Sequence, residues 1–150
     1  MTLTDPPLIL VADDDPDLLA LLRVNLEVEG YAVMCALDGL EALEMAGRMR
    51  PALVVLDVMM PGLDGLEVTQ RLRADPATEN LPIVLLTARG SDPQIWEGWQ
   101  SGANYYVTKP FDVDQLLGYV ANLLSTTEID EPPVYTFTTW SGAEAGDDSA

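Results

Sequence analysis

Short apolar runs alternate with amphipathic segments along this chain, and this alternation limits the folds open to it more than any other feature. Runs of this length and composition are typical of strands. Alternating strands and helices favour parallel pairing, right-handed crossovers and helices on both faces of the sheet. The sequence therefore predicts an α/β fold with a doubly wound, five-stranded parallel sheet. The five runs are Leu8–Ala12, Tyr31–Ala36, Leu53–Leu56, Ile83–Leu86 and Tyr105–Thr108.

The segments between the runs carry signals for helices. Asp15 and Pro16 suit the cap and first turn of a helix that Gly30 would end. Apolar residues at helical spacing predict further helices near residues 40–49, 66–72 and 92–101. Asp112 suits the cap of a last helix, so we expect five helices.

The composition of the chain changes near residue 126. Residues 1–126 are enough for one domain with an ordinary core. Residues 127–150 contain six acids, no base and the pair Pro132-Pro133. We expect this tail to be a mostly flexible extension. Fewer than 30 residues follow the last helix, so we expect either a stand-alone domain or one excised from a longer protein.

The net charge of −18 disfavours direct binding to nucleic acid. The apolar runs are too short to cross a membrane and no basic segment opens the chain, so we expect a cytoplasmic protein with no membrane contact. The absence of histidine excludes histidine-based catalysis within the chain. Its single cysteine, Cys35, lies in an apolar run and is interpreted as a core residue rather than a redox group.

Polar residues follow four of the five apolar runs. Asp13 and Asp14 follow the first run, Asp57 the third and Thr87 the fourth. The fifth run is followed by Lys109, the only lysine in the chain. Ligands of parallel α/β sheets bind beyond the carboxyl ends of the strands. Each residue could be an ordinary strand end, but their complementary chemistry favours one shared site.

The chemistry of this set points to phosphate. Three carboxylates brought together repel one another unless a cation lies between them, and their oxygens suit Mg²⁺. A threonine hydroxyl and an ammonium group can bind the oxygens of a phosphoryl group. We therefore predict phosphoryl transfer, with Asp57 as the candidate nucleophile that forms an acyl phosphate.

Together these motifs resemble the receiver domain of bacterial response regulators. The similarity spans roughly residues 7–125, with its motifs in the family's order and spacing. It implies a CheY-like (βα)5 fold with strand order 2-1-3-4-5. The matching stretches are Ile9–Asp15, Val54–Val68, Leu85–Ala88, Ser101–Ala103 and Thr108–Phe111.

The resemblance implies a phosphoacceptor signalling domain of a two-component phosphorelay. Asp57 would accept a phosphoryl group from a sensor histidine kinase or a phosphotransfer protein. Asp13, Asp14, Asp57 and the main-chain carbonyl of Met59 would hold Mg²⁺. The domain would catalyse only its own phosphorylation and dephosphorylation and would not be an enzyme acting on other substrates.

The resemblance also implies a switch. Thr87 and Lys109 would bind phosphoryl oxygens, and the peptide bond between Lys109 and Pro110 would be cis. Thr87 and Tyr106 would transmit the conformational change that follows phosphorylation to the face formed by the fourth helix, fifth strand and fifth helix. A downstream protein would bind to this face.

Some positions depart from the family's pattern. Trp96 and Trp99 are either core residues or an apolar recognition patch on the fourth helix. The last helix contains no base and Tyr105 replaces a common acid, which disfavours a homodimer held by charged pairs and leaves an apolar homodimer open. Met59 lies two residues after Asp57, where it cannot orient an attacking water, so we predict slow self-dephosphorylation.

Three other classes remain open at this point. A Mg²⁺-dependent aspartyl phosphatase also uses an acidic cluster with a lysine, but its usual second aspartate is replaced by Met59. A flavodoxin-like FMN protein needs a hydroxyl-rich loop after the first strand, where this chain has three aspartates. A pseudo-receiver that acts without phosphorylation would not need all five site residues.

Overall fold

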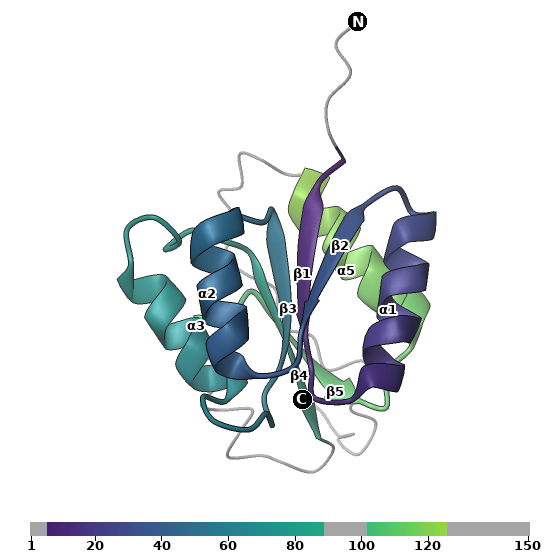
Figure 1. Ribbon diagram of the computed structural model, residues 1–150. Coiled ribbons are helices and arrows are strands. Elements are labelled where there is room, and N and C mark those ends of the chain that lie inside the picture. The colour runs from purple at the N-terminus through teal and green to yellow at the C-terminus, as the bar shows by residue number, and fades with distance from the viewer. Residues whose placement is uncertain (1–5, 89–101, 126–150) are drawn as a thin grey trace, which may run out of the picture.

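The computed structural model describes residues 6–88 and 102–125, which contain five strands and four helices (Figure 1). The fourth helix expected at residues 92–101, with Trp96 and Trp99, lies outside the described residues, as does the tail. The elements are β1 (Leu8–Ala12), α1 (Pro16–Val28), β2 (Ala32–Ala36), α2 (Gly39–Met49), β3 (Leu53–Asp57), α3 (Gly65–Ala74), β4 (Ile83–Ala88), β5 (Tyr105–Lys109) and α5 (Val113–Ser125).

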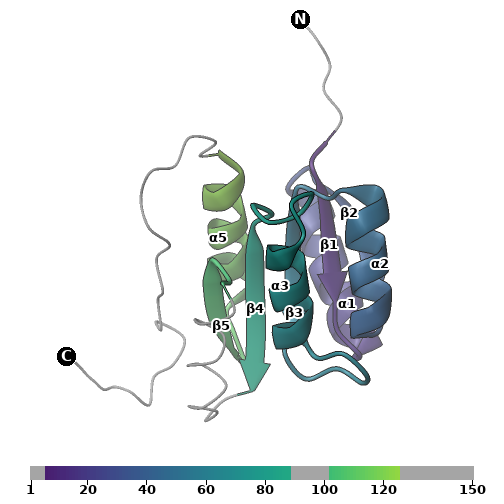
Figure 2. The same cartoon turned by 90° about the vertical axis from the view of Figure 1, so that its left-hand side faces the viewer.

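The strands form one parallel sheet in the order β2-β1-β3-β4-β5, which confirms the predicted fold class. Helices α1 and α5 cover one face, and α2 and α3 cover the other (Figures 1 and 2). Every strand therefore ends at the same edge of the sheet, called here the carboxyl edge.

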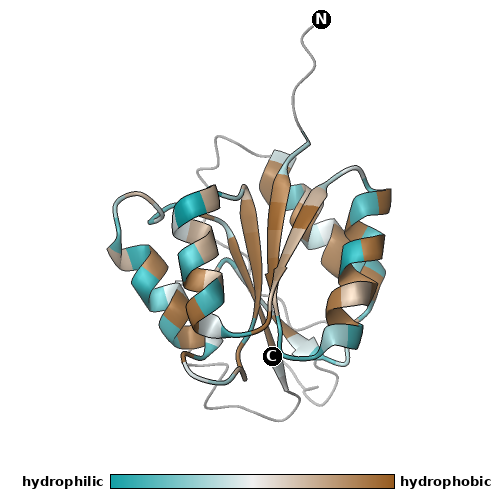
Figure 3. Ribbon diagram, viewed as in Figure 1, coloured by the Kyte–Doolittle hydropathy of each residue, from teal (hydrophilic) through white to brown (hydrophobic). Residues whose placement is uncertain are grey.

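The core has two halves, one on each face of the sheet. Successive side chains of a strand point to opposite faces. In β1, Leu10 belongs to the half beneath α2 and α3, whereas Ile9 and Val11 belong to the half beneath α1 and α5. Both faces are buried, which explains why the strands are apolar over most of their length (Figure 3). Cys35 packs partly buried against the second half, and this burial, with Glu27, raises the pKa of its thiol despite the opposing charge of Arg23.

The structure confirms the predicted ends of α1. The Asp15 carboxylate accepts a hydrogen bond from the main-chain N–H of Asp17 at 3.0 Å. At the other end Gly30 adopts a φ of 99°, a region that glycine enters without strain. The N–H groups of Gly30 and Tyr31 then donate to carbonyls in the last turn of the helix. The predicted cap of α5 is also present, since Asp112 accepts a hydrogen bond from the N–H of Asp114.

Strand lengths differ slightly from the prediction. β2 begins at Ala32 rather than Tyr31, and β3, β4 and β5 continue through Asp57, Ala88 and Lys109. Main-chain pairing does not depend on side-chain polarity, so the polar residues Asp57, Thr87 and Lys109 belong to the ends of strands rather than to the loops after them. Their positions are therefore fixed by the sheet itself. No helix in the described part of the chain is both long and apolar enough to span a bilayer.

Candidate functional site

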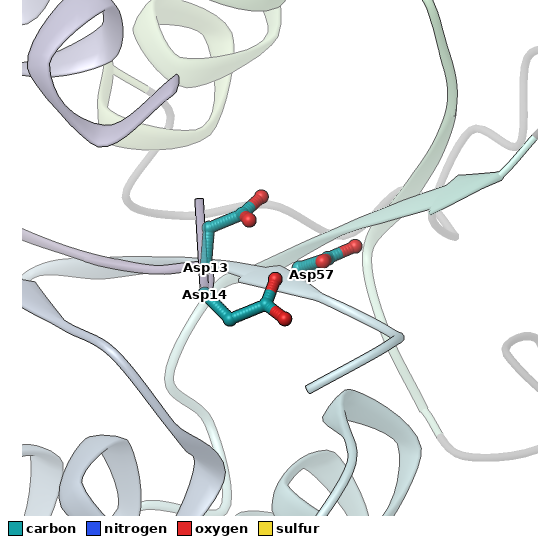
Figure 4. Close-up of side chains that lie close together, drawn as sticks. All are labelled: Asp13, Asp14 and Asp57. Atoms are coloured by element: carbon teal, nitrogen blue, oxygen red, sulfur yellow. The ribbon is translucent and has the colours of Figure 1, made fainter. Parts of the chain in front are cut away.

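Three carboxylates meet at the carboxyl edge of β1 and β3, which are neighbours in the sheet. Asp13 and Asp14 directly follow β1, and Asp57 is the last residue of β3. One oxygen from each carboxylate lies within 4.8 Å of the others, and Figure 4 shows the three side chains gathered there. Asp13 is fully buried and Asp57 is 3% exposed, whereas Asp14 faces solvent.

Lys109 joins this cluster from β5, two strands away from β3. Its Nζ lies 3.0 Å from Oδ2 of Asp13 and 3.2 Å from Oδ1 of Asp57. The second oxygen of Asp13, Oδ1, accepts a hydrogen bond from the N–H of Asp15 at 2.9 Å. Both oxygens of this buried carboxylate therefore have partners. The Lys109–Pro110 peptide bond is cis, as expected.

The environment of Asp57 disfavours its charged form. Burial is the largest influence and the charge of Asp13 adds to it, while the Lys109 ammonium and a main-chain hydrogen bond from Met59 oppose them. Together these raise the pKa of Asp57 to about 6. The carboxylate is still mostly ionised at pH 7.5, and additional positive charge nearby would stabilise this ionised form.

Burial alone would lower the pKa of Lys109, but hydrogen bonds and charges from Asp13 and Asp57 outweigh it and raise the pKa above its usual range. The ammonium therefore stays charged through neutral pH. It is the only basic side chain in the described residues that forms an ion pair with this cluster.

The two predicted switch residues lie on β4 and β5. Thr87 is fully buried and follows Leu86, which pairs in register with Asp57. Tyr106 is also buried, with its side chain among the core residues beneath α2 and α3. Thr87 therefore lies at the carboxyl edge near the carboxylates, and Tyr106 adopts an inward arrangement.

Two glycines that the sequence analysis did not single out shape the loops near Asp57. A Cβ at Gly65 would collide with the main-chain oxygen of Asp57, and one at Gly39 with that of Leu63. Each glycine follows an aspartate that caps a helix, Asp64 for α3 and Asp38 for α2. The Asp-Gly pair at the start of each helix is the sequence signal that could have revealed them, because glycine lets a neighbouring main chain approach closely.

The donor set fits a hard divalent cation. Carboxylate oxygens are the ligands that Mg²⁺ takes in proteins, usually with several waters retained. Asp14 is exposed and gives water access, while the buried pair Asp13 and Asp57 supplies charge that a single lysine only partly offsets. A cation bound here would stabilise the charged carboxylate of Asp57, whose pKa is raised by burial and by the charge of Asp13.

A doubly wound sheet with an acidic cluster and a lysine at its carboxyl edge is the architecture of a receiver domain. Residues 9–121 match the response regulator receiver domain family, and the chain belongs to that family. Members of this family generally bind Mg²⁺.

Two curated proteins are similar to this chain over most of its length. The chain is 44% identical over 122 residues to the DNA-binding dual master transcriptional regulator RpaA of Synechocystis sp., which covers 81% of this chain and 51% of RpaA. It is 47% identical over 128 residues to the response regulator MprA of Mycobacterium sp., covering 85% of this chain and 55% of MprA. The chain thus spans about half the length of the curated relatives it matches.

A solved structure shares the fold. The crystal structure of a putative response regulator from Chloroflexus aurantiacus superimposes with a TM-score of 0.76 at 38% identity, covering 80% of this chain and 98% of that one.

The raised pKa of Asp57 predicts a stability effect. We expect Asp57→Asn to raise the free energy of unfolding of the metal-free protein at pH 7.5 by about 1–3 kcal/mol, because it removes a charge that burial makes costly. The pKa rises from 3.8 to about 6 on folding, so the folded state holds the proton more tightly. The carboxyl group's contribution to stability is therefore present below about pH 4 and is lost as the pH rises through 6.

The gain in the free energy of unfolding that Asp57→Asn gives at pH 7.5 should accordingly vanish near pH 4. Urea unfolding in EDTA at pH 4 and pH 7.5, compared with the parent chain at each pH, measures it. Asp114→Asn, an exposed acid in the first turn of α5, is the control. An equal gain at both pH values, or a loss at pH 7.5, would show that the charge of Asp57 is not the cause.

Proposed function

We propose that Asp57 accepts a phosphoryl group from the phosphohistidine of a sensor histidine kinase or phosphotransfer protein. The observation that carries this proposal is the pairing of Lys109 with both Asp13 and Asp57 at the carboxylate cluster. One ammonium and two further carboxylates, those of Asp13 and Asp14, therefore lie close to the Asp57 carboxylate. This is the charge arrangement that phosphoryl transfer needs, since positioning and neutralisation supply most of its catalysis.

In the proposed reaction, a carboxylate oxygen of Asp57 attacks phosphorus. An O–P bond forms as the P–N bond of the donor breaks, and the leaving imidazole takes up a proton. At pH 7.5 a carboxyl group with a pKa of about 6 is mostly ionised and is therefore competent as the nucleophile. Lys109 would turn its ammonium toward a phosphoryl oxygen. Mg²⁺, held by Asp13, Asp14, Asp57 and the Met59 carbonyl, would neutralise the remaining charge.

The phosphoryl group adds nearly two negative charges and three strong acceptors beside β4 and β5. The Thr87 hydroxyl and the Lys109 ammonium are the groups we expect to move toward it. Tyr106 would then exchange its buried position for an outward one. This would shift a balance between existing arrangements and change the surface around β5 and α5 that a downstream protein reads.

The other classes are less favoured. Membership of the receiver family argues against a phosphatase or a flavoprotein. A pseudo-receiver is less favoured because all five predicted site residues lie in the carboxylate cluster or at the carboxyl edge of the sheet. They are Asp13, Asp14, Asp57, Thr87 and Lys109. The phosphorylation chemistry would be confined to the domain itself, with no other substrate. We also propose a cytoplasmic location, which is typical of response regulators.

DNA binding is a property named for RpaA. We propose that this chain does not itself bind DNA, because its net charge of −18 repels phosphates. We further propose that residues 1–126 form the receiver domain and residues 127–150 a separate acidic tail. The family match to residue 121 and the end of α5 at Ser125 support that boundary.

Binding of an acyl-phosphate mimic should protect Lys109 from acylation. Lysine-directed reagents can modify only Lys109 and the N-terminal amine. With beryllofluoride and Mg²⁺ we expect acylation of Lys109 to slow severalfold, because its ammonium would contact the mimic, while the N-terminal amine serves as the internal control. Peptide mapping by mass spectrometry gives both rates. Equal acylation of Lys109 with and without the bound mimic would contradict its proposed role.

Met59 should prolong the life of the phosphorylated form. Its side chain is 56% exposed two residues beyond Asp57, where a polar group could orient an attacking water. We therefore expect Met59→Asn to shorten the lifetime of the phosphoryl group severalfold, as measured by loss of the phosphorylated mass over time. Met49→Asn replaces an equally exposed methionine at the far end of α2 and is the matched control. An unchanged lifetime in Met59→Asn would disprove this role.

A further inference from the structure

The basic residues of this acidic chain are concentrated away from the phosphoryl site. Four of its seven bases, Arg48, Arg50, Arg71 and Arg73, lie in or just after the last turns of α2 and α3. Both helices end at the edge of the sheet where the strands begin, opposite the carboxyl edge (Figures 1 and 2). Most of the positive charge of the chain therefore lies at this edge, although the net charge of the chain is −18.

Three of these arginines have no partner among the described residues. Arg73 is engaged, since it donates to the carbonyl oxygens of Leu81 and Gly102 and to the side chain of Asn104. Arg48, Arg50 and Arg71 are exposed, and within residues 6–88 and 102–125 they form no ion pair or side-chain hydrogen bond. Their position also suits the negative end of a helix dipole, but that effect fades within a turn and leaves most of each charge available.

Two adjoining hollows lie among these arginines. The first, of about 540 Å³, lies between the ends of α2 and α3 and the segment after α3. The second, of about 250 Å³, shares Pro76 and Thr78 with the first and extends past Arg50 to the start of β3. We call the pair the arginine groove. Its walls include Leu43, Leu72, Pro76, Thr78, Arg50 and Arg71.

The groove would suit an extended segment with both apolar and acidic side chains. Leu43, Leu72 and Pro76 offer apolar contact, while Arg50 and Arg71 offer charge. The one acid in the lining is Asp75, whose Oδ1 is occupied by the N–H of Ala77. Arginine is well suited to this task, because its planar guanidinium binds carboxylates in a bidentate manner.

The chain itself contains such a segment. Residues 128–140 begin with Glu128, Asp130 and Glu131, continue through Pro132-Pro133, and end in the threonine-rich aromatic run Val134–Trp140, with no base. We propose that residues 128–140 bind in the arginine groove of the same molecule. This contact is separate from the phosphoacceptor function and does not depend on it.

Length and position allow the contact. α5 ends at Ser125 at the same edge of the sheet as the ends of α2 and α3 but on the opposite face, so the tail would pass around this edge (Figures 1 and 2). Glu131 is six residues beyond Ser125, so an extended chain could place it up to about 20 Å from the end of α5. A domain of this size has a radius of gyration of only ~14 Å. Covalent attachment also gives the segment an effective concentration in the millimolar range, so modest affinity is enough to fill the groove.

The test uses the fluorescence of Trp140 in the full-length chain. Trp96→Phe and Trp99→Phe leave Trp140 as the only tryptophan. Quenching by acrylamide, which is neutral and insensitive to the charges, reports how accessible its ring is. We expect severalfold slower quenching in the full chain than in a synthetic peptide of residues 126–150. High salt should reduce that protection, because it screens the arginine–carboxylate contacts.

Variants on each side of the contact identify the groove. Arg50→Glu with Arg71→Glu should raise quenching to the level of the free peptide, and adding Glu128→Arg with Glu131→Arg should restore protection. Arg23→Glu alters an exposed arginine on α1 and should change nothing. Neutralising the tail acids with Glu128→Gln, Asp130→Asn and Glu131→Gln should also release Trp140, without altering any described residue.

Several results would overturn the proposal. Quenching in the full chain as fast as in the peptide would mean that the segment is unbound. Protection that survives Arg50→Glu with Arg71→Glu would place it elsewhere. Protection that grows with protein concentration would mean that a second copy supplies the segment. Asp57→Ala should leave protection unchanged, which separates failure of this proposal from failure of the phosphoacceptor assignment.

Discussion

Asp57→Ala should abolish phosphorylation of the chain by a small phosphodonor such as phosphoramidate in the presence of Mg²⁺. Asp57 is the carboxylate that ends β3, and Lys109 lies 3.2 Å from one of its oxygens. Removing the nucleophile leaves no group at this position that can form an acyl phosphate. Intact-mass measurement should show one added phosphoryl group in the parent chain and none in the variant.

A matched control separates loss of the acceptor from loss of an ordinary acid. Asp114→Ala removes an exposed aspartate from the first turn of α5, away from the cluster, and should be phosphorylated like the parent. Circular dichroism should confirm that both variants are folded. Phosphorylation of Asp57→Ala at the parent level would mean that another residue is the acceptor.

Lys109→Ala should destabilise the metal-free protein by about 2–4 kcal/mol at pH 7.5, because breaking a buried ion pair leaves uncompensated charge behind. The lysine is the shared partner of Asp13 and Asp57, both of which are buried. A loss of this size corresponds to a fall in Tm of about 10 °C for a domain of this length. Thermal unfolding in EDTA at pH 7.5 gives the shift.

Mg²⁺ should restore much of the stability that Lys109→Ala loses. A cation bound by the carboxylates would replace the charge that the lysine supplied, so added Mg²⁺ should raise the Tm of Lys109→Ala more than that of the parent. Phosphorylation should persist in part, while partner binding no longer responds to it. Arg23→Ala breaks an exposed pair with Glu27 and should cost at most about 0.5 kcal/mol. A Lys109→Ala cost as small as that of Arg23→Ala would refute the structural role of the ion pair.

The fold and the gathering of polar residues at one edge of the sheet were largely predictable because their signals are local. An apolar run followed by Asp57 or Lys109 marks the end of a strand, and alternation with helices brings such ends to one edge. Only two of the N-terminal helix caps, Asp15 and Asp112, were predicted from the sequence. Asp38 and Asp64 each have a glutamate three residues later, the pattern of a capped helix start, and both accept a hydrogen bond from that residue's N–H.

The geometry within the site was not predictable in the same way. Lys109 contacts Asp13 across 96 positions of sequence and reaches past the ends of β4 and β3 to do so. No local pattern encodes how far a long side chain extends across a sheet, or that one ammonium serves two carboxylates. Arg73 is similar, since its contacts with Leu81, Gly102 and Asn104 tie α3 to the segments before β4 and β5.

The most direct test of the central claim is to locate the acyl phosphate by reduction. Borohydride reduces an aspartyl phosphate to the alcohol, which converts the acceptor residue to homoserine and releases phosphate. After treatment with phosphoramidate and Mg²⁺, peptide mapping should find homoserine at position 57, and none there when the donor or Mg²⁺ is omitted. Homoserine at any other aspartate, or none at position 57 in a protein that carries the phosphoryl mass, would contradict the account.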